Sequence, residues 1–225
     1  MVNIQDIRQI TTILFDFDGV IGDTESGRYD AYCDIFGEYG YDLRSRCRMN
    51  DLIGFTGDGF MGKYFPEIPA DTVAEMVRKR QRHYMDNLDI FCRPFPGAQQ
   101  TVKDLKQKGY YTALTTANAT AVAKQLLETV GLTEYFDAVC GREICEDFTK
   151  KVKEYSRVPE HIGKTAGECV VIEDSPVGVA GAKRGGFYCI AFDHLKHPLI
   201  REQADVIVHD FNELRKLFGL DEIDL

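Results

Sequence analysis

The chain has 225 residues, 44% of them hydrophobic and 28% charged, which is typical of a soluble globular protein. Its net charge of −9 argues against a general binder of nucleic acid or of an anionic membrane, because such a protein needs a basic surface. Seven cysteines without a C-x-x-C pair indicate neither a disulfide framework nor a zinc site. The absence of a signal-peptide core and of an apolar run near ~18 residues predicts a cytoplasmic protein.

The first expected strand, about 12–17, runs directly into two aspartates. Asp16 and Asp18 are followed by Gly19. A buried strand that ends on carboxylates must satisfy their charge with a bound cation, with backbone N–H groups, or with both. Alternation along the strand would put the two carboxylates on one side, where they can divide the roles of nucleophile and acid/base. A solvated Asp-x-Asp-Gly turn or a helix cap is the plainer alternative.

Residues 24–92 have the pattern of a helical module. A helix is expected over about 24–39, and amphipathic stretches follow it, including 70–88, whereas β-branched runs are scarce. The prolines and the glycine of residues 93–97 then interrupt the chain. Because this module follows the first strand, it is predicted to be an insertion.

From residue 98 onward, helical and strand-like patterns alternate. The expected elements are helix 98–108, strand 110–115, helix 119–130, strand 136–140, a polar lysine-rich segment 146–166, strand 168–172, helix 178–185, strand 188–192, strand 206–208 and a helix that ends near 218. Such alternation predicts parallel βαβ units in an α/β, Rossmann-like, doubly wound sheet. The expected domains are a core of residues 1–23 and 93–225 and an inserted helical domain of residues 24–92.

Two further strand ends carry polar residues. Thr116, Ala117 and Asn118 follow one strand, and Glu173 and Asp174 follow another. Ligands bind in the crevice beyond the carboxyl ends of parallel strands, so these residues are expected to lie near Asp16. Carboxylate and carbonyl oxygens suit Mg²⁺, and hydroxyl and amide donors suit a phosphate. The plainer alternatives are that Ser175 caps a helix and that Thr116 merely ends a strand.

Four ordered motifs resemble those of the haloacid dehalogenase superfamily of phosphohydrolases. They are Asp16-Phe17-Asp18-Gly19-Val20, then Leu114-Thr115-Thr116, then a lysine near position 150, and finally Ile172-Glu173-Asp174-Ser175-Pro176-Val177-Gly178-Val179. The segments Asp23-Thr24-Glu25 and Pro96-Gly97-Ala98 resemble the two linkers of the branch that holds β-phosphoglucomutase and sugar-phosphate phosphatases. In that branch the inserted domain is a helical cap that closes over the site.

The resemblance implies a role for each matching residue. Asp16 would attack phosphorus and form an aspartyl-phosphate, and Asp18 would protonate the leaving oxygen and then deprotonate water. Thr116 would bind the transferring phosphoryl group, and Lys150 or Lys151 would neutralise it. Mg²⁺ would be held by Asp16, the Asp18 carbonyl oxygen and Asp174, with Glu173 as a ligand or a neighbour of one. Since dehalogenases of the superfamily lack the second aspartate, Asp18 argues against carbon–halogen hydrolysis.

The chain departs from the branch pattern in two places. The third motif usually has prolines after the lysine, but here the segment is Thr149-Lys150-Lys151-Val152-Lys153, so the choice between the lysines is open, with spacing favouring Lys151. In β-phosphoglucomutase a histidine of the first cap linker couples closure to the acid/base aspartate, and here Arg28 stands at that position. Gly57 stands where the mutase has a phosphate-binding arginine. Both differences favour a phosphatase over a mutase.

The predicted function is therefore Mg²⁺-dependent hydrolysis of a small phosphorylated metabolite, with a sugar phosphate as the expected class. Candidate substrate contacts are Gly19, Glu25, Arg28, Thr56, Arg80, Thr116, Ala117 and Asn118, of which the cap residues could equally be surface or packing residues. The alternatives are a sugar-phosphate mutase and a non-catalytic ligand-binding protein of the same fold. No nucleic-acid or membrane partner is expected, and the sequence identifies no protein partner.

Overall fold

The computed structural model describes residues 10–49, 61, 63–147, 152–153, 155–194, 200 and 203–225. The chain divides into two compact units. The core unit comprises Met1–Gly22 and Pro94–Leu225, and the inserted unit comprises Asp23–Arg93. The sequence had placed the two divisions after residues 23 and 92.

The core unit is built on a six-stranded parallel sheet. Its strands are β1 (Thr12–Phe15), β4 (Tyr111–Thr115), β5 (Ala138–Cys140), β8 (Cys169–Glu173), β9 (Tyr188–Phe192) and β10 (Val206–Val208), in the order β10-β9-β8-β1-β4-β5. All residues of β1 and β8 are buried, as expected for strands covered on both faces. The predicted α/β, Rossmann-like, doubly wound fold is confirmed.

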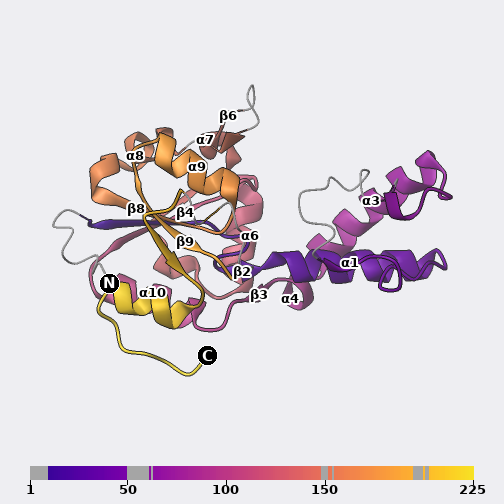
Figure 1. Ribbon diagram of the computed structural model, residues 1–225, viewed down its shortest axis with the longest axis horizontal. Coiled ribbons are helices and arrows are strands. Elements are labelled where there is room, and N and C mark those ends of the chain that lie inside the picture. Colours follow the sequence, from indigo (N-terminus) through magenta and orange to yellow (C-terminus); the bar gives the residue numbers. More distant parts are fainter. Residues whose placement is uncertain are drawn as a thin grey trace. The chain divides into compact units, whose positions relative to one another are not determined.

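The strand order reverses direction between β1 and β8. From β1 the chain proceeds outward through β4 to β5, then returns to β8 on the other side of β1 and proceeds through β9 to β10. Helices α8 (Arg157–Ile162) and α9 (Pro176–Arg184) lie on one side of the sheet and α10 (Phe211–Leu217) on the other (Figure 1). The crevice at such a reversal point is where open α/β sheets bind ligands.

Several short elements complete the core unit. They are α5 (Ala98–Gln107), α6 (Thr120–Thr129), η3 (Thr133–Tyr135), α7 (Arg142–Cys145), β6 (Glu146–Asp147), β7 (Val152–Lys153) and η4 (Ala166–Glu168). The antiparallel pair of β6 and β7 and the helix α8 fall in the segment for which the sequence had indicated only a polar, lysine-rich stretch. Two-residue strands and a six-residue helix are too short for a periodicity signal.

The inserted unit is helical in its described residues, as its pattern predicted. It contains α1 (Thr24–Glu38), α3 (Ala70–Asp86) and α4 (Leu88–Phe91), and α1 packs against both of the others. Asp23 caps α1 by accepting a hydrogen bond from the Ser26 N–H at 3.1 Å. The chain enters this unit through β2 (Gly22–Asp23) and leaves through β3 (Arg93–Pro94), which pair with each other.

Each unit has its own apolar cluster. The cluster of the core unit joins β1 and β8 residues to Tyr155, Val179 and Phe187, and that of the inserted unit includes Phe36 and Phe65. All seven cysteines lie in the described part of the chain, and none of them forms a disulfide. Among the described helices, none combines the length and apolar character needed to cross a membrane.

Candidate active site

The first strand ends two residues earlier than predicted. β1 stops at Phe15, although the Asp16 N–H still donates to the Ile172 carbonyl at 3.0 Å and continues the pairing with β8. The chain then turns, since the Phe17 carbonyl accepts hydrogen bonds from the N–H groups of residues 20, 21 and 22. Strand alternation therefore does not extend to Asp18, whose position depends on this turn.

Asp16 is a buried carboxylate held by the start of the turn. It is 6% exposed, and its Oδ1 accepts a hydrogen bond from the Phe17 N–H at 2.8 Å. Gly19 follows with φ +75°, a conformation that favours glycine. A Cβ at Gly19 would lie 1.8 Å from Asp174 Oδ2, so this backbone approaches the second acidic strand end as only glycine can.

Glu173, the last residue of β8, is fully buried and surrounded by donors. Its Oε1 accepts from the Tyr155 hydroxyl at 2.7 Å, and its Oε2 accepts from the Ser175 N–H at 3.1 Å and the Ser175 hydroxyl at 3.0 Å. Ser175 also caps α9, the plainer alternative for this residue, by accepting from the Gly178 N–H at 3.0 Å. A Cβ at Gly178 would lie 1.9 Å from Glu173 Oε1, so glycine leaves room for the carboxylate.

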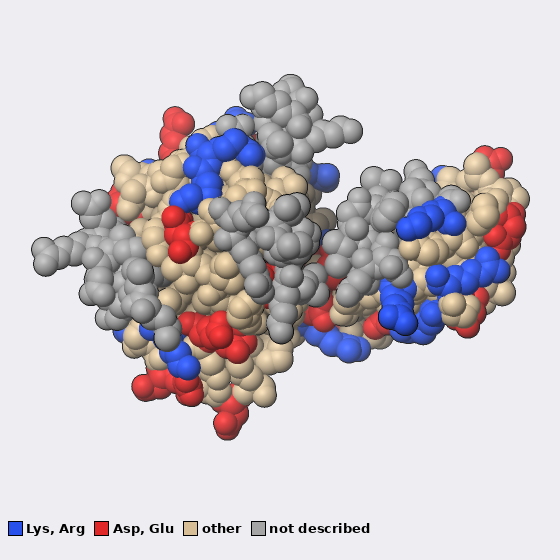
Figure 2. Space-filling model, viewed as in Figure 1, with Lys and Arg blue, Asp and Glu red and all other residues tan. Residues whose placement is uncertain are grey.

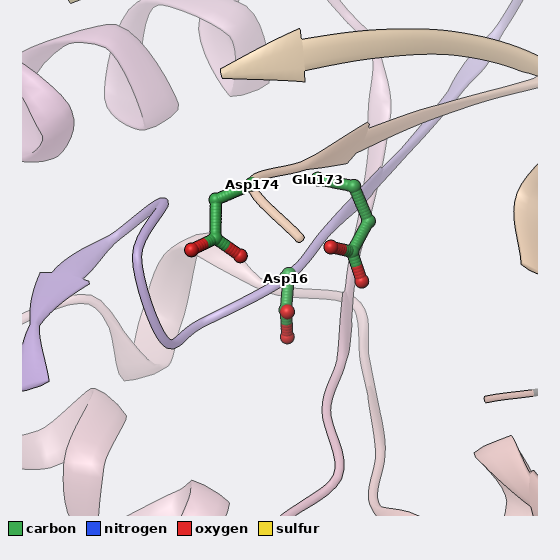
Figure 3. Close-up of side chains that lie close together, drawn as sticks. All are labelled: Asp16, Glu173 and Asp174. Carbon is green, nitrogen blue, oxygen red and sulfur yellow. The ribbon is translucent and has the colours of Figure 1, made fainter. Parts of the chain in front are cut away.

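Three carboxylates converge at the reversal point of the sheet. One oxygen from each of Asp16, Glu173 and Asp174 lies within 4.8 Å of the others, and Figure 3 shows Asp174 and Glu173 at the end of β8 with Asp16 between and below them in the view. Clustered anionic carboxylates repel one another and are costly to bury. An all-oxygen set of this kind has the chemistry of a site for a hard divalent cation, and Gly19 keeps Asp174 in the set.

The end of β4 supplies the hydroxyl and the amide. Thr116 is fully buried, and its N–H donates to the Cys140 carbonyl at 3.0 Å. Asn118 Nδ2 donates to Asp18 Oδ2 at 2.7 Å and to Thr116 Oγ1 at 3.1 Å. The structure thus brings Asp18, Thr116 and Asn118 together, whereas the intervening Ala117 is exposed.

Two described ionisable groups near the end of β4, Cys140 and Glu143, have shifted pKa values. Burial raises the pKa of the Cys140 thiol to about 11, so this thiol remains protonated at neutral pH. Glu143 has its pKa lowered by its own backbone N–H and by the Thr120 hydroxyl. Its Oε2 accepts from the Thr120 hydroxyl at 2.8 Å and from the Thr120 N–H at 3.1 Å, where α6 begins.

The remaining predicted site residues fall into two groups. Glu25, Arg28 and Arg80 belong to the inserted unit: Arg28 pairs with Glu25 at 3.4 Å, and the Arg80 guanidinium lies 4.4 Å from the centre of the Tyr32 ring and donates to its hydroxyl at 3.2 Å. Lys150, Lys151, Thr56 and Gly57 lie outside the described residues.

One residue of the site was not anticipated. Tyr155 is fully buried beneath Glu173 and lies in the lysine-rich segment, where no motif marks it. A tyrosine in a polar stretch shortly before a helix was the available signal, because burying an aromatic hydroxyl requires a hydrogen-bond partner.

Comparisons with known proteins agree with this geometry. The family model described as haloacid dehalogenase-like hydrolase matches residues 13–192. A phosphoglycolate phosphatase of Caulobacter vibrioides is 24% identical over 211 residues, covering 91% of this chain and 89% of that protein. The protein SUPPRESSOR OF QUENCHING 1, chloroplastic, of Arabidopsis thaliana is 26% identical over 215 residues, but this chain spans only 20% of its length.

A solved structure shares the fold. The HAD family hydrolase from Deinococcus radiodurans R1, determined with bound phosphate and sodium, superposes with a TM-score of 0.73 at 18% identity, covering 96% of this chain and 99% of that one. The family match spans most of the chain and includes the three strand ends just described. The expected enzyme class, a hydrolase, is confirmed, and the named relatives support phosphatase function. The chain belongs to the haloacid dehalogenase-like hydrolase family.

Proposed function

We propose that the chain is an Mg²⁺-dependent phosphatase that hydrolyses a small phosphorylated metabolite, of the sugar-phosphate class, through an aspartyl-phosphate at Asp16. The observation that carries the proposal is the convergence of Asp16, Glu173 and Asp174 at the reversal point of the sheet. The buried hydroxyl of Thr116 at the end of the adjacent strand β4 supports it, because a phosphoryl group needs donors as well as charge neutralisation.

The chemistry divides between the two aspartates of the first turn. An Asp16 carboxylate oxygen forms a bond to phosphorus while the ester oxygen departs with a proton from Asp18. Asp18 then takes a proton from water, whose oxygen attacks phosphorus, releases inorganic phosphate and restores the Asp16 carboxylate. Thr116 hydrogen-bonds the transferring group in both steps, and Lys150 or Lys151 is assigned its neutralisation.

The carboxylates of Asp16 and Asp174 and the carbonyl oxygen of Asp18 are the assigned holders of Mg²⁺. Glu173 already accepts three hydrogen bonds from Tyr155 and Ser175, so we place it beside the ion as a residue that adds charge and order. When bound, Mg²⁺ would offset negative charge on the carboxylates and on the transferring phosphoryl oxygens.

The substrate class depends on the inserted unit. Glu25, Arg28, Thr56 and Arg80 are the assigned candidates for contacts with the part of the substrate that is not transferred, together with Gly19 and Ala117 of the core unit. The printed name of the Caulobacter relative adds phosphoglycolate to the compounds worth testing.

The test is a panel of phosphate monoesters, including glucose 1-phosphate, glucose 6-phosphate and phosphoglycolate, assayed for phosphate release with Mg²⁺ and with EDTA. We expect steady release from at least one ester and a decrease of at least about 100-fold with EDTA. Equal rates with and without EDTA would contradict the metal dependence, and no release from any ester would contradict phosphatase function.

One further assay distinguishes the proposed phosphatase from a sugar-phosphate mutase. β-Glucose 1-phosphate is supplied with a glucose bisphosphate activator, and both glucose 6-phosphate and inorganic phosphate are measured. A phosphatase releases phosphate steadily without the activator. Isomerisation that requires the activator and releases little phosphate would replace our proposal with the mutase.

A further inference from the structure

Asn118 uses all of its N–H donors inside the protein. Its two side-chain amide hydrogens are directed to Asp18 Oδ2, at 2.7 Å from Nδ2, and to Thr116 Oγ1, at 3.1 Å. Its backbone N–H also donates to Thr116 Oγ1, at 3.1 Å. An amide nitrogen carries two hydrogens, so Nδ2 has none left for a phosphate oxygen. Its carbonyl oxygen is an acceptor and would repel an anion.

The same contacts fix the direction of the Thr116 hydroxyl. A hydroxyl has two acceptor sites and one hydrogen to donate. The backbone and side-chain N–H groups of Asn118 occupy the two acceptor sites of Thr116 Oγ1. The single O–H of Thr116 must therefore act as a donor to another group, which is the role that binding a phosphoryl oxygen requires.

The amide orientation follows from its partners. Turning the amide around would bring its carbonyl oxygen against the Asp18 carboxylate at 2.7 Å, two acceptors in repulsion. With nitrogen toward Asp18, the contact is a charge-assisted hydrogen bond at a favourable length. The side chain thus links the acid/base aspartate to the phosphoryl-binding hydroxyl, across 100 residues of sequence.

The loop that carries Asn118 is held by hydrogen bonds at every second residue, at Thr116, Asn118 and Thr120. The Thr116 N–H donates to the Cys140 carbonyl at 3.0 Å, and the Asn118 carbonyl accepts from the Arg142 N–H at 2.8 Å. Thr120 donates through both its N–H and its hydroxyl to Glu143. These bonds fix the loop along the β5–α7 segment, so the Asn118 amide is in place before any substrate binds.

We propose that Asn118 is a positioning residue: it aims the Asp18 carboxylate at the leaving oxygen and orients the Thr116 hydroxyl as a donor, instead of binding substrate itself. The inference rests on the proposed phosphatase function and replaces the substrate contact that the sequence suggested for Asn118. Its signature is a defect in leaving-group protonation, which differs from a defect in substrate binding.

The test compares two aryl phosphates of similar size with Mg²⁺ present. 4-Nitrophenolate leaves without much help from an acid, whereas phenolate needs a proton as the bond breaks. In Asn118→Ala we expect kcat/KM, which reports the step in which the ester oxygen departs, to fall at least about 10-fold more for phenyl phosphate than for 4-nitrophenyl phosphate. Asn118→Ser, measured beside it, should give the same preference because its side chain is too short to replace the amide.

The matched control is Asn212→Ala. The Asn212 amide also makes two hydrogen bonds in the core unit, to the Ile223 carbonyl at 2.8 Å and from the Ile223 N–H at 2.9 Å, but far along the chain from the three strand ends. We expect its kcat/KM for both esters to equal that of the wild-type chain. This control distinguishes the general effect of removing a hydrogen-bonded amide from the effect of removing the hydrogen bond to Asp18.

Two outcomes would overturn the inference while the proposed function stands. One is an equal loss of kcat/KM for both esters in both Asn118 variants, and the other is a raised KM with unchanged kcat, the signature of a substrate contact. If the wild-type chain releases phosphate from neither aryl ester and from no ester of the panel above, the proposed function fails and the inference falls with it.

Discussion

Polar side chains at the strand ends of the core unit are used differently from those of the ion pairs in the inserted unit. At the strand ends they are buried or half-buried and paired across long stretches of sequence, as Asn118 is with Asp18 and Tyr155 with Glu173. In the inserted unit the ion pairs lie at the surface; the Arg44 and Asp30 side chains, for example, are 60% and 37% exposed although their atoms are 2.7 Å apart. Figure 2 shows charged side chains of both signs on the exposed surface of each unit.

Buried and exposed hydrogen bonds of the same geometry differ in how much they contribute to the free energy of unfolding. Hydrogen bonds of similar length are worth about 0–1 kcal/mol when exposed, but breaking a buried one leaves a partner that water cannot reach. Matched substitutions, one in each unit, therefore measure how strongly the strand ends are organised.

The largest contrast is expected between Gly19→Ala and Gly40→Ala. Both glycines have positive φ, +75° and +80°, so both variants should lose about 1–2 kcal/mol of stability. A Cβ at Gly19 would also meet Asp174 Oδ2 at 1.8 Å, whereas a Cβ at Gly40 meets nothing within 4 Å. Because misplacing a site group by about 1 Å can cost about 100-fold, we expect that loss of kcat/KM in Gly19→Ala alone. Equal activities of the two variants would contradict the close approach.

The second contrast removes one hydroxyl from each unit. Tyr155→Phe takes a buried donor from Glu173, and Tyr39→Phe takes a surface donor, at 2.8 Å, from Glu75. We expect urea unfolding to show about 1–3 kcal/mol of destabilisation for Tyr155→Phe and less than about 0.5 kcal/mol for Tyr39→Phe. Similar values for the two variants would mean that Glu173 does not depend on Tyr155.

The smallest contrast is a dependence on pH. Burial alone would raise the pKa of Asp137, but hydrogen bonds from the Lys106 ammonium and the Thr112 N–H lower it below the ordinary value. A lowered pKa in the folded state stabilises the fold above the unfolded pKa of about 3.9, and this contribution is lost as the pH falls through the folded value. Asp137→Asn should therefore unfold more easily than the wild-type chain at pH 7, with the difference disappearing at acidic pH.

Glu67→Gln is the control for that measurement in the inserted unit. Hydrogen bonds from its own backbone N–H and from Arg46 lower the pKa of Glu67, but the pair is exposed. We expect no measurable change in unfolding at any pH. A pH-independent difference between Asp137→Asn and the wild-type chain would show that the substitution acts through packing and not through charge.

The sequence predicted the parts of the site that depend on local pattern. Apolar strands followed at once by Asp16 or Glu173 are a local signal, and the topology of a doubly wound sheet brings such ends together. The same reasoning made the first strand two residues too long. The chain turns there because the Phe17 carbonyl accepts three backbone hydrogen bonds, and no residue pattern predicts this.

The remaining features depend on tertiary placement. Asn118 was recognised as polar and near the site, but its use of every N–H donor for Asp18 and Thr116 is a property of the folded loop. The contact from Tyr155 to Glu173 joins a lysine-rich segment to a strand end, and helix α8 follows it without a periodic pattern. Residues of the inserted unit gave weaker predictions because a half-buried ion pair such as Arg28 with Glu25 has the same sequence signature whether or not it contacts substrate.

The most direct measurement is kcat/KM for phosphate release by the wild-type chain and by Asp16→Asn, on the best ester of the panel with saturating Mg²⁺. Asparagine keeps the shape of the side chain but is a far poorer nucleophile, and circular dichroism would establish that both proteins are folded. If Asp16 attacks phosphorus, the variant should lose at least about 1000-fold in kcat/KM. A folded variant that retains activity within about 10-fold of the wild-type chain would contradict the proposed mechanism.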